Sequence, residues 1–143
     1  MTLDYSELAQ LHRKQVECGI RVRDDATTEV RERFAQYFVG DVVISAITLA
    51  ELEFGVACSG QALADNKAAL DSLLEDIVVM PFEAGAVRAY GPLRAAHRDR
   101  NKSARDKLIA SHAMALHIPL VTNNEADFIG YPGLVIENWV ENQ

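Results

Sequence analysis

Two acidic residues stand where α/β proteins commonly bind their ligands. Glu51 lies six residues after the segment 42–45, whose β-branched side chains are typical of a strand buried on both faces. Ser45 is a residue type that begins helices, so Glu51 falls in a helix that follows this strand. Asp106 falls in the first turn of a helix predicted at 104–116. Because open α/β sheets bind ligands beyond the carboxyl ends of their strands, Glu51 is the anchor of a candidate site.

A second group of polar side chains follows the strand predicted at 119–122. Thr122 ends this segment, and Asn124 and Asp127 lie in the loop after it. Carboxylate and amide oxygens are the ligands that hard divalent cations such as Mg²⁺ and Mn²⁺ take. A cation held there can position a water molecule, lower its pKa and stabilise the transition state of phosphoryl chemistry. The sequence therefore suggests a metal site at this edge of the sheet.

The same residues also allow structural interpretations. Asp106 can cap its helix or interact with the helix dipole, and Glu51 can lie in solvent on the surface of its helix. Spacing alone does not decide between these interpretations and a metal site. Glu53 points to a different side of the helix from Glu51 and is interpreted as structural. Three further residues are interpreted as core: Tyr90, His112 and Trp139.

Short apolar segments alternate with longer amphipathic ones through most of the 143 residues. This alternation favours a single α/β domain with a mainly parallel central sheet and helices on both faces. Strands are predicted at 42–45, 77–80, 119–122 and 134–136, with a short edge strand at 20–23. Helices are predicted at 4–18, 29–38, 61–76, 83–98 and 104–116, with Val87, Tyr90 and Leu93 facing inward and a kink at Gly91-Pro92.

Composition narrows the function classes. The net charge is −7, which counts against a broad basic surface for nucleic acid but is compatible with a nuclease that holds its substrate through metal ions. No apolar run approaches the length of a membrane span, and the N-terminus lacks the pattern of a secretory signal. Cys18 and Cys58 form no disulfide framework. We expect a cytoplasmic protein with two reduced thiols.

Several ordered motifs resemble those of one family. The segment Ile44–Gly55 resembles the second acidic motif of PIN-domain ribonucleases, in particular the VapC toxins of bacterial toxin–antitoxin modules. The segment Asp106–Ala113 resembles the helix that carries the third acid of the family, and Leu120–Phe128 with Pro132–Trp139 resembles its C-terminal end. The resemblance covers about residues 29 to 140.

The resemblance implies a PIN-like three-layer fold and a Mg²⁺- or Mn²⁺-dependent endoribonuclease that cuts structured RNA. It also implies a cognate antitoxin that silences the enzyme, and a homodimer. Glu51 and Asp106 correspond to the second and third metal-site acids. Asn124 falls where many members have a fourth acid, Asp127 is more peripheral, and Thr122 is expected to orient a ligand or the attacking water.

Residues 1–28 depart from the family pattern. The family opens with a strand that ends in an Asp, a principal metal ligand. The nearest counterpart is Leu3-Asp4-Tyr5-Ser6, which no β-branched segment precedes and which lies farther from Glu51 than is usual in the family. Asp24 and Asp25 lie too close to Glu51. We therefore expect the sheet to lose its middle strand, unless 20–23 or the N-terminal residues supply it. Catalysis is then weak or absent unless Asp4, Asp24 or Asp25 reaches the site.

Basic residues surround the third acid, in a loop that is shorter and more charged than the Gly-Pro-rich loop of the family. They are candidates for contacts with RNA phosphates, with a solvated, salt-bridged surface as the structural alternative: Arg98, Arg100, Lys102 and Arg105. Two other functions remain open. One is a catalytically impaired PIN-like module that binds an antitoxin or dimerises. The other is a domain for a phosphorylated small ligand, which the lack of a Gly-rich phosphate loop disfavours.

Overall fold

The apolar segments form a five-stranded parallel sheet in a computed structural model of the chain, which describes residues 2–3, 32–38, 40–98 and 104–140. The strand order is β3-β2-β1-β4-β5, and each neighbouring pair is parallel. All strands are short: β1 (Thr2–Leu3), β2 (Val43–Ser45), β3 (Val78–Met80), β4 (Leu120–Val121) and β5 (Ile136–Glu137).

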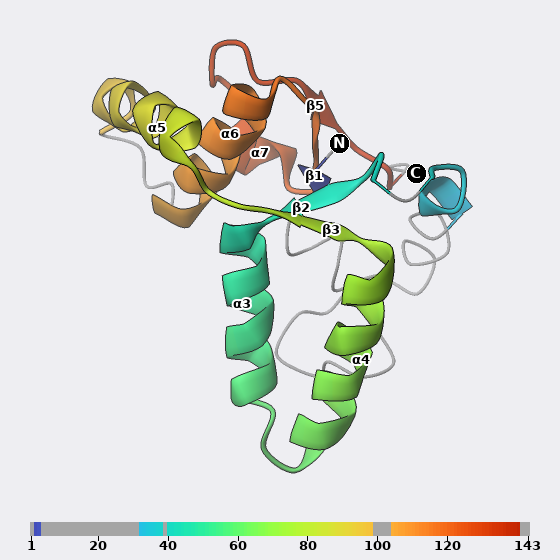
Figure 1. Cartoon of the computed structure of the whole chain (residues 1–143). Helices are drawn as coiled ribbons and strands as arrows, with labels where there is room; N and C mark the ends of the chain where they lie inside the picture. The colour runs from blue at the N-terminus through green and yellow to red at the C-terminus, as the bar shows by residue number, and fades with distance from the viewer. Residues whose placement is uncertain (1, 4–31, 39, 99–103, 141–143) are drawn as a thin grey trace.

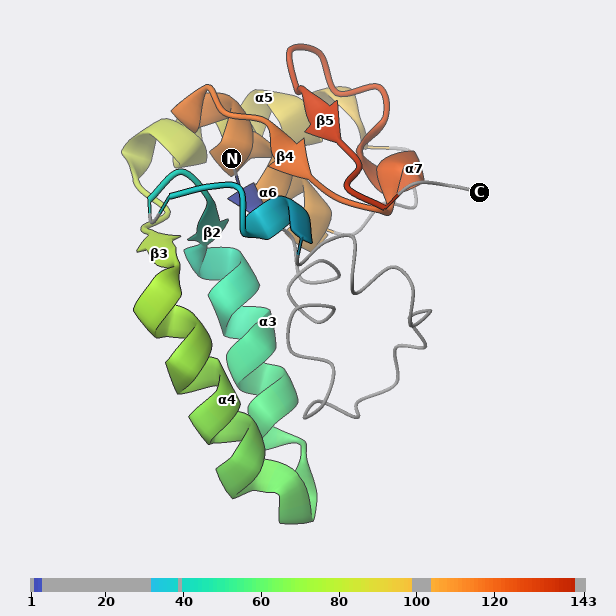
Figure 2. The same ribbon diagram turned by 90° about the vertical axis from the view of Figure 1, so that its right-hand side faces the viewer.

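Helices cover the two faces of this sheet (Figure 1). On one face, α3 (Ala46–Ala57) and α4 (Leu63–Asp76) form a long hairpin that the 3-10 helix η1 (Gly60–Ala62) closes. On the other face lie α5 (Ala84–Ala96), α6 (Ala104–Leu116) and the short α7 (Glu125–Phe128), as the rotated view in Figure 2 also shows. The predicted three-layer arrangement is confirmed.

Each face of the sheet has its own hydrophobic core, because successive side chains of a strand point to opposite faces. In β4, Leu120 packs in the core with Ile109 of α6, whereas Val121 packs in the core with Leu52 of α3. Leu120 and Val121 are both fully buried. This burial on both faces explains why the sequence shows continuous apolar runs rather than alternation.

The middle strand of the sheet is present, and of the two alternatives that the sequence left open the N-terminal residues supply it. Thr2 and Leu3 form β1, which pairs with β2 on one side and β4 on the other, with Leu3 in register with Ile44 and Val121. Thr2 is buried, and its N–H donates to the carbonyl of Pro119. Two residues at the very start of the chain are too short for a hydrophobic pattern to reveal; only the pairing partners identify them as a strand.

Other local predictions differ in detail. Val87 of α5 is 54% exposed rather than inward, and Pro92 lies inside α5, which is assigned as one helix from Ala84 to Ala96. Leu93, Trp139 and His112 are buried as predicted, whereas Tyr90 is half-buried and accepts a hydrogen bond from Arg94. Residues 32–34 are helical within the helix predicted at 29–38. The predicted helix 4–18 and strand 20–23 lie outside the described residues. In the parts of the chain that the structure describes, no helix could span a membrane.

Candidate active site

The carboxyl ends of β1, β2 and β4 meet at one edge of the sheet. Leu3, Ile44 and Val121 are in register across the three strands, so Ser45 and Thr122 follow at the same level toward this edge, on either side of β1. The residue that follows β1 in the sequence is Asp4, which lies outside the described residues, as do Asp24 and Asp25. The candidate site is built around this edge.

Glu51 comes to this edge on α3. Ser45 caps the helix, because its hydroxyl oxygen accepts a hydrogen bond of 3.1 Å from the N–H of Ile47. The buried stripe of α3 runs through Thr48, Leu52 and Gly55, one turn apart. Glu51 flanks this stripe, and its side chain is 35% exposed. The helix therefore anchors Glu51 while leaving the carboxylate accessible to solvent.

Asp106 lies in the first turn of α6, and its side chain is only 12% exposed. Because α6 leads into β4 and the strands are parallel, α6 begins near the carboxyl edge of the sheet and ends near the amino edge. The positive end of the helix dipole stabilises a carboxylate in this position. Helices α3 and α6 are in contact, which brings the two acid-bearing elements together.

One guanidinium links the two acids. Nη1 of Arg105 donates to Oε2 of Glu51 at 2.8 Å, and Nε of Arg105 lies 3.5 Å from Oδ1 of Asp106. Partial burial opposes the charge of Arg105, but the hydrogen bond to Glu51 and the negative charges of both acids raise the pKa of Arg105 above its ordinary value. Glu51 and Asp106, which are 55 positions apart in the sequence, therefore lie within reach of a single cation.

A buried histidine holds the two acid-bearing helices together. Nδ1 of His112, on α6, lies 2.8 Å from the hydroxyl oxygen of Ser45, the cap of α3. The carbonyl of Pro81, just after β3, accepts a hydrogen bond from the same imidazole, and the ring packs edge-on against Phe82. Burial lowers the pKa of His112, although the Pro81 carbonyl and Glu83 oppose this effect. We assign the neutral imidazole, which accepts from Ser45 and donates to Pro81.

The loop after β4 forms its own polar network. Thr122 is fully buried, and its side-chain oxygen accepts a hydrogen bond from the N–H of Asn124 at 3.1 Å. The side-chain amide of Asn124 donates to Asp127. Asn138 donates to Glu125 at 2.8 Å, which ties the loop to the segment after β5. Thr122 and Asn124 thus lie at the predicted edge.

The predicted basic residues are only partly described. Arg98 is exposed just beyond the end of α5, and Arg100 and Lys102 lie outside the described residues. Arg105 pairs with the acids rather than standing free in solvent. Glu53 is exposed and faces Lys67 at 3.9 Å, which agrees with its structural interpretation. Within the described residues, no group of three or more His, Cys, Asp or Glu could hold a metal ion.

Sequence reasoning missed the interactions that join the elements of the site. The Arg105–Glu51 pair and the Ser45–His112 pair span 54 and 67 positions in the sequence. A local signal did exist for Ser45, because a helix cap directly after a strand fixes the turn between them. No comparable signal shows that Glu51 and Ser45 contact residues of α6.

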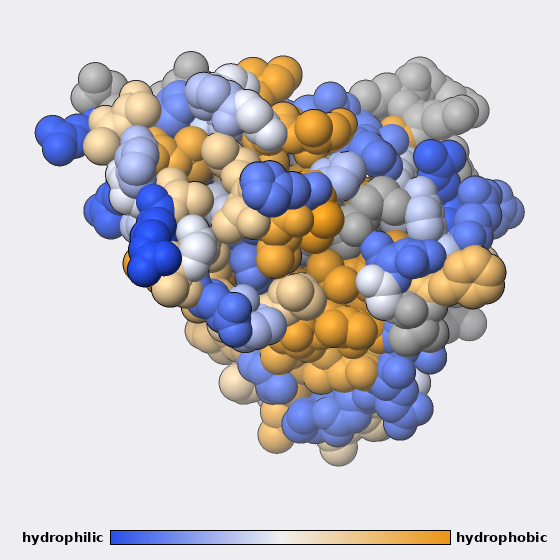
Figure 3. All heavy atoms as spheres, turned by 45° about the horizontal axis from the view of Figure 1, so that its top comes forward, coloured by the Kyte–Doolittle hydropathy of each residue, from blue (hydrophilic) through white to orange (hydrophobic). Residues whose placement is uncertain are grey.

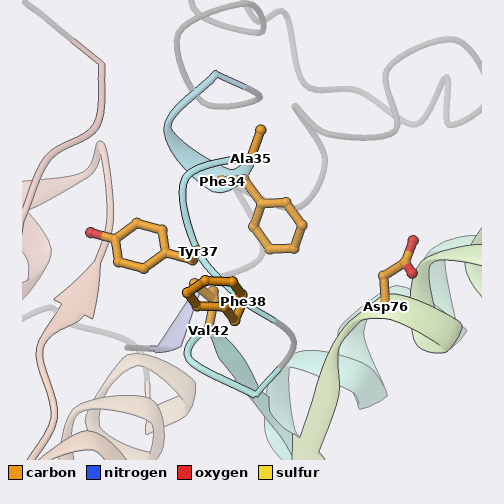
Figure 4. Close-up of a pocket in the computed structure, with 6 residues that line it drawn as sticks. All are labelled: Phe34, Ala35, Tyr37, Phe38, Val42 and Asp76. Carbon is orange, nitrogen blue, oxygen red and sulfur yellow. The ribbon is translucent and has the colours of Figure 1, made fainter.

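A hollow lies near the amino ends of β2 and β3 (Figure 4). It has a volume of about 180 Å³ and is lined by Phe34, Ala35, Tyr37, Phe38, Val42 and Asp76. Val42 and Asp76 come just before β2 and β3, at the amino ends of these strands. Asp76 is the only carboxylate among the lining residues, so this apolar hollow does not resemble a metal site.

Comparison with known proteins gives one consistent group. The sequence profile of the PIN domain matches residues 20–133. The chain is 39% identical to Ribonuclease VapC2 of Rickettsia felis over 100 residues, which cover 68% of this chain and 74% of that protein. It is 36% identical to the tRNA(fMet)-specific endonuclease VapC of Shigella flexneri over 112 residues, covering 77% and 83% of the two chains.

Solved structures extend the likeness to almost the whole chain. The structure of VapBC2 from Rickettsia felis bound to a DNA fragment from its promoter matches with a TM-score of 0.78 and 31% identity, covering 96% of this chain and 97% of that chain. DNA-bound VapBC from Salmonella typhimurium matches with a TM-score of 0.80 and 28% identity, covering 96% of each chain. The structural match thus includes more of the chain than the profile, which begins after β1.

Proposed function

Because the chain belongs to the PIN-domain family, among the VapC ribonucleases, we propose that it is a metal-dependent endoribonuclease toxin that cleaves structured RNA and that a cognate antitoxin neutralises. The observation that carries the proposal is the convergence of Glu51 and Asp106 on one cation, the guanidinium of Arg105. A pair of carboxylates brought together at the carboxyl edge of a parallel sheet is suited to a hard divalent ion.

The donor set supports a Mg²⁺ or Mn²⁺ site. Glu51 and Asp106 supply carboxylate oxygens, and Asp4 is the best candidate for a third ligand because β1 ends one residue before it. This argument favours Asp4 over Asp24 and Asp25. A bound ion would activate a water molecule and stabilise the charge that develops on the phosphate. The presence of β1 removes one of the two reasons for expecting an impaired enzyme, the loss of the middle strand; the other is met in this proposal by Asp4.

The remaining site residues have supporting roles in this proposal. Thr122, buried just after β4, orients the loop that carries Asn124, because its side-chain oxygen accepts a hydrogen bond from the N–H of Asn124. Asn124, in the loop after β4, is the candidate for a neutral ligand. Arg98, Arg100 and Lys102, which precede Asp106 in the sequence, are the candidates for contacts with RNA phosphates, which the acids would otherwise repel.

An apolar surface is available for protein partners. Phe38 is 85% exposed beside the hollow of Figure 4, and Phe54 of α3 is 67% exposed. Figure 3 shows hydrophobic residues gathered in a band across the middle of one face, bordered by hydrophilic ones. Exposed apolar area of this kind is typical of protein–protein contacts. It supports the proposed binding of an antitoxin and of a second copy of the chain; the cytoplasmic location is part of the same proposal.

The proposal is tested by calorimetric Mn²⁺ titration together with cleavage of a folded tRNA. We expect one micromolar site whose binding and cleavage are both abolished by Glu51→Gln, by Asp106→Asn and by Asp4→Asn. Glu53→Gln is the matched control, because it removes the same charge from an exposed position two residues along α3. Expression in bacteria should arrest growth, and Glu51→Ala should relieve the arrest.

Two results would contradict this proposal. If the folded protein bound no Mn²⁺ and arrested no growth, the chain would be a non-catalytic binding module. If Glu53→Gln abolished binding as fully as Glu51→Gln, the general negative charge of α3 would be responsible, not a specific site.

A further inference from the structure

We propose that Arg105 competes with the metal ion for Glu51 and Asp106. Its guanidinium binds the two carboxylates when no ion is bound, and it moves to a substrate phosphate when the ion binds. This inference rests on the proposed metal site. It adds a role that neither the acids nor the surrounding basic residues have, namely the coupling of metal binding to substrate binding.

The geometry places Arg105 where an ion would have to bind. Its guanidinium uses two different nitrogens, Nη1 toward Glu51 and Nε toward Asp106. A planar guanidinium donates from several fixed directions, so a single group can face two carboxylates. A divalent ion held by the carboxylates of Glu51 and Asp106 would lie close to the positive charge of Arg105. The ion and the guanidinium therefore exclude each other.

The energetic balance allows an exchange. The Arg105 side chain is 46% exposed and that of Glu51 is 35% exposed, so their ion pair is partly screened by water. A divalent ion carries twice the charge and binds carboxylates directly, so it can displace the guanidinium. Displacement costs the hydrogen bond to Glu51, which lowers the apparent affinity for the metal about three- to tenfold.

The displaced side chain has a second use. Arg105 lies in the first turn of α6 next to Asp106, so the freed guanidinium stays within a side-chain length of the bound ion. Guanidinium groups bind phosphate through paired hydrogen bonds. RNA that reaches the bound ion would therefore meet the freed guanidinium of Arg105, which can bind an RNA phosphate. Metal binding and RNA binding would then favour each other.

The test compares Mn²⁺ affinity, measured by calorimetry without RNA, between the natural chain and Arg105→Gln. We expect Arg105→Gln to bind Mn²⁺ about three- to tenfold more tightly. The matched control is Arg94→Gln, which removes the same charge from α5, where Arg94 contacts Tyr90 instead of either acid. At saturating Mn²⁺, Arg105→Gln should cleave RNA with a raised KM, although its metal site is better filled.

Each outcome is decisive. Tighter Mn²⁺ binding in Arg105→Gln, with Arg94→Gln unchanged, supports the competition. Unchanged or weaker binding in Arg105→Gln, or equal tightening in Arg94→Gln, overturns it while leaving the metal site intact. An unchanged KM would overturn the substrate role. If no variant bound Mn²⁺ at all, the proposed function and this inference would both fail.

Discussion

Replacing Ser45 with alanine removes one hydroxyl that serves two hydrogen bonds. It accepts from the N–H of Ile47 at the start of α3 and donates to Nδ1 of His112 on α6. Loss of the helix cap costs about 1 kcal/mol. The lost donor also leaves the buried Nδ1 of His112 without its partner, which costs about 1–3 kcal/mol more. We therefore expect Ser45→Ala to reduce the free energy of unfolding by about 2–4 kcal/mol.

Urea unfolding measures this loss, with Ser59→Ala as the control. The hydroxyl of Ser59 donates only to the carbonyl of Val56, within the same turn, so its removal should cost less than about 1 kcal/mol. Ser45→Ala should also weaken Mn²⁺ binding, since the Ser45–His112 pair joins the helices that carry Glu51 and Asp106. Equal stability loss in the two variants would refute the reasoning.

His112 gives the same contact a pH dependence. Burial lowers the pKa of His112 below its ordinary value of 6.5, so the unfolded chain takes up this proton at a higher pH than the folded chain does. The stability that His112 contributes is complete above about pH 6.5 and is lost as the pH falls toward the pKa of the folded state. His112→Gln lacks this titration, so its stability should fall less than that of the natural chain between about pH 7.5 and pH 5. Identical slopes would contradict the assignment of a neutral, buried imidazole.

Three further predictions concern the site loop, the core and one turn. Asn124→Asp adds a carboxylate at the carboxyl edge and should tighten Mn²⁺ binding severalfold by calorimetry; unchanged affinity would place residue 124 outside the metal site. Leu120→Ala, fully buried at the start of β4, should cost about 2–5 kcal/mol in urea unfolding, whereas Val135→Ala, 58% exposed, should cost less than about 0.5 kcal/mol. His117 has a φ of 54° just after α6, so His117→Gly should raise the melting temperature and His117→Val should lower it; the reverse order would refute a strained turn.

Much of the fold follows from local patterns. The apolar runs at 42–45 and 119–122 became strands with buried side chains, and the β-branched run at 77–80 became the edge strand β3, in which Val78 is 41% exposed. The helices from Ala46 to Leu116 follow from their spacing and caps, with errors of a few residues at their ends. Val87 was misplaced because helical spacing shows which residues share a face, not which face the neighbouring helix covers.

The candidate site, like the fold, could be predicted from the sequence only in part. Glu51 was recognised from its position after a strand, and Asp106 from its position at the start of a helix. The residues that join them were not recognised. Arg105 is adjacent to Asp106 in sequence, and the charge pattern predicts a contact with RNA but does not reveal its pair with Glu51, 54 positions away. A charge pattern along one helix cannot show which acid of another helix it will meet.

The sequence by itself determined which segments form helices and which form strands, and it showed that acids follow the strands. These features depend on hydrophobic periodicity and helix caps, which act over a few residues. Only the tertiary structure decided that Thr2 and Leu3 complete the middle of the sheet, since a two-residue strand acquires its identity from the neighbours with which it pairs. It also decided that Glu51 and Asp106 share one guanidinium. That contact depends on how α3 packs against α6, and the buried pair of Ser45 and His112 joins these two helices.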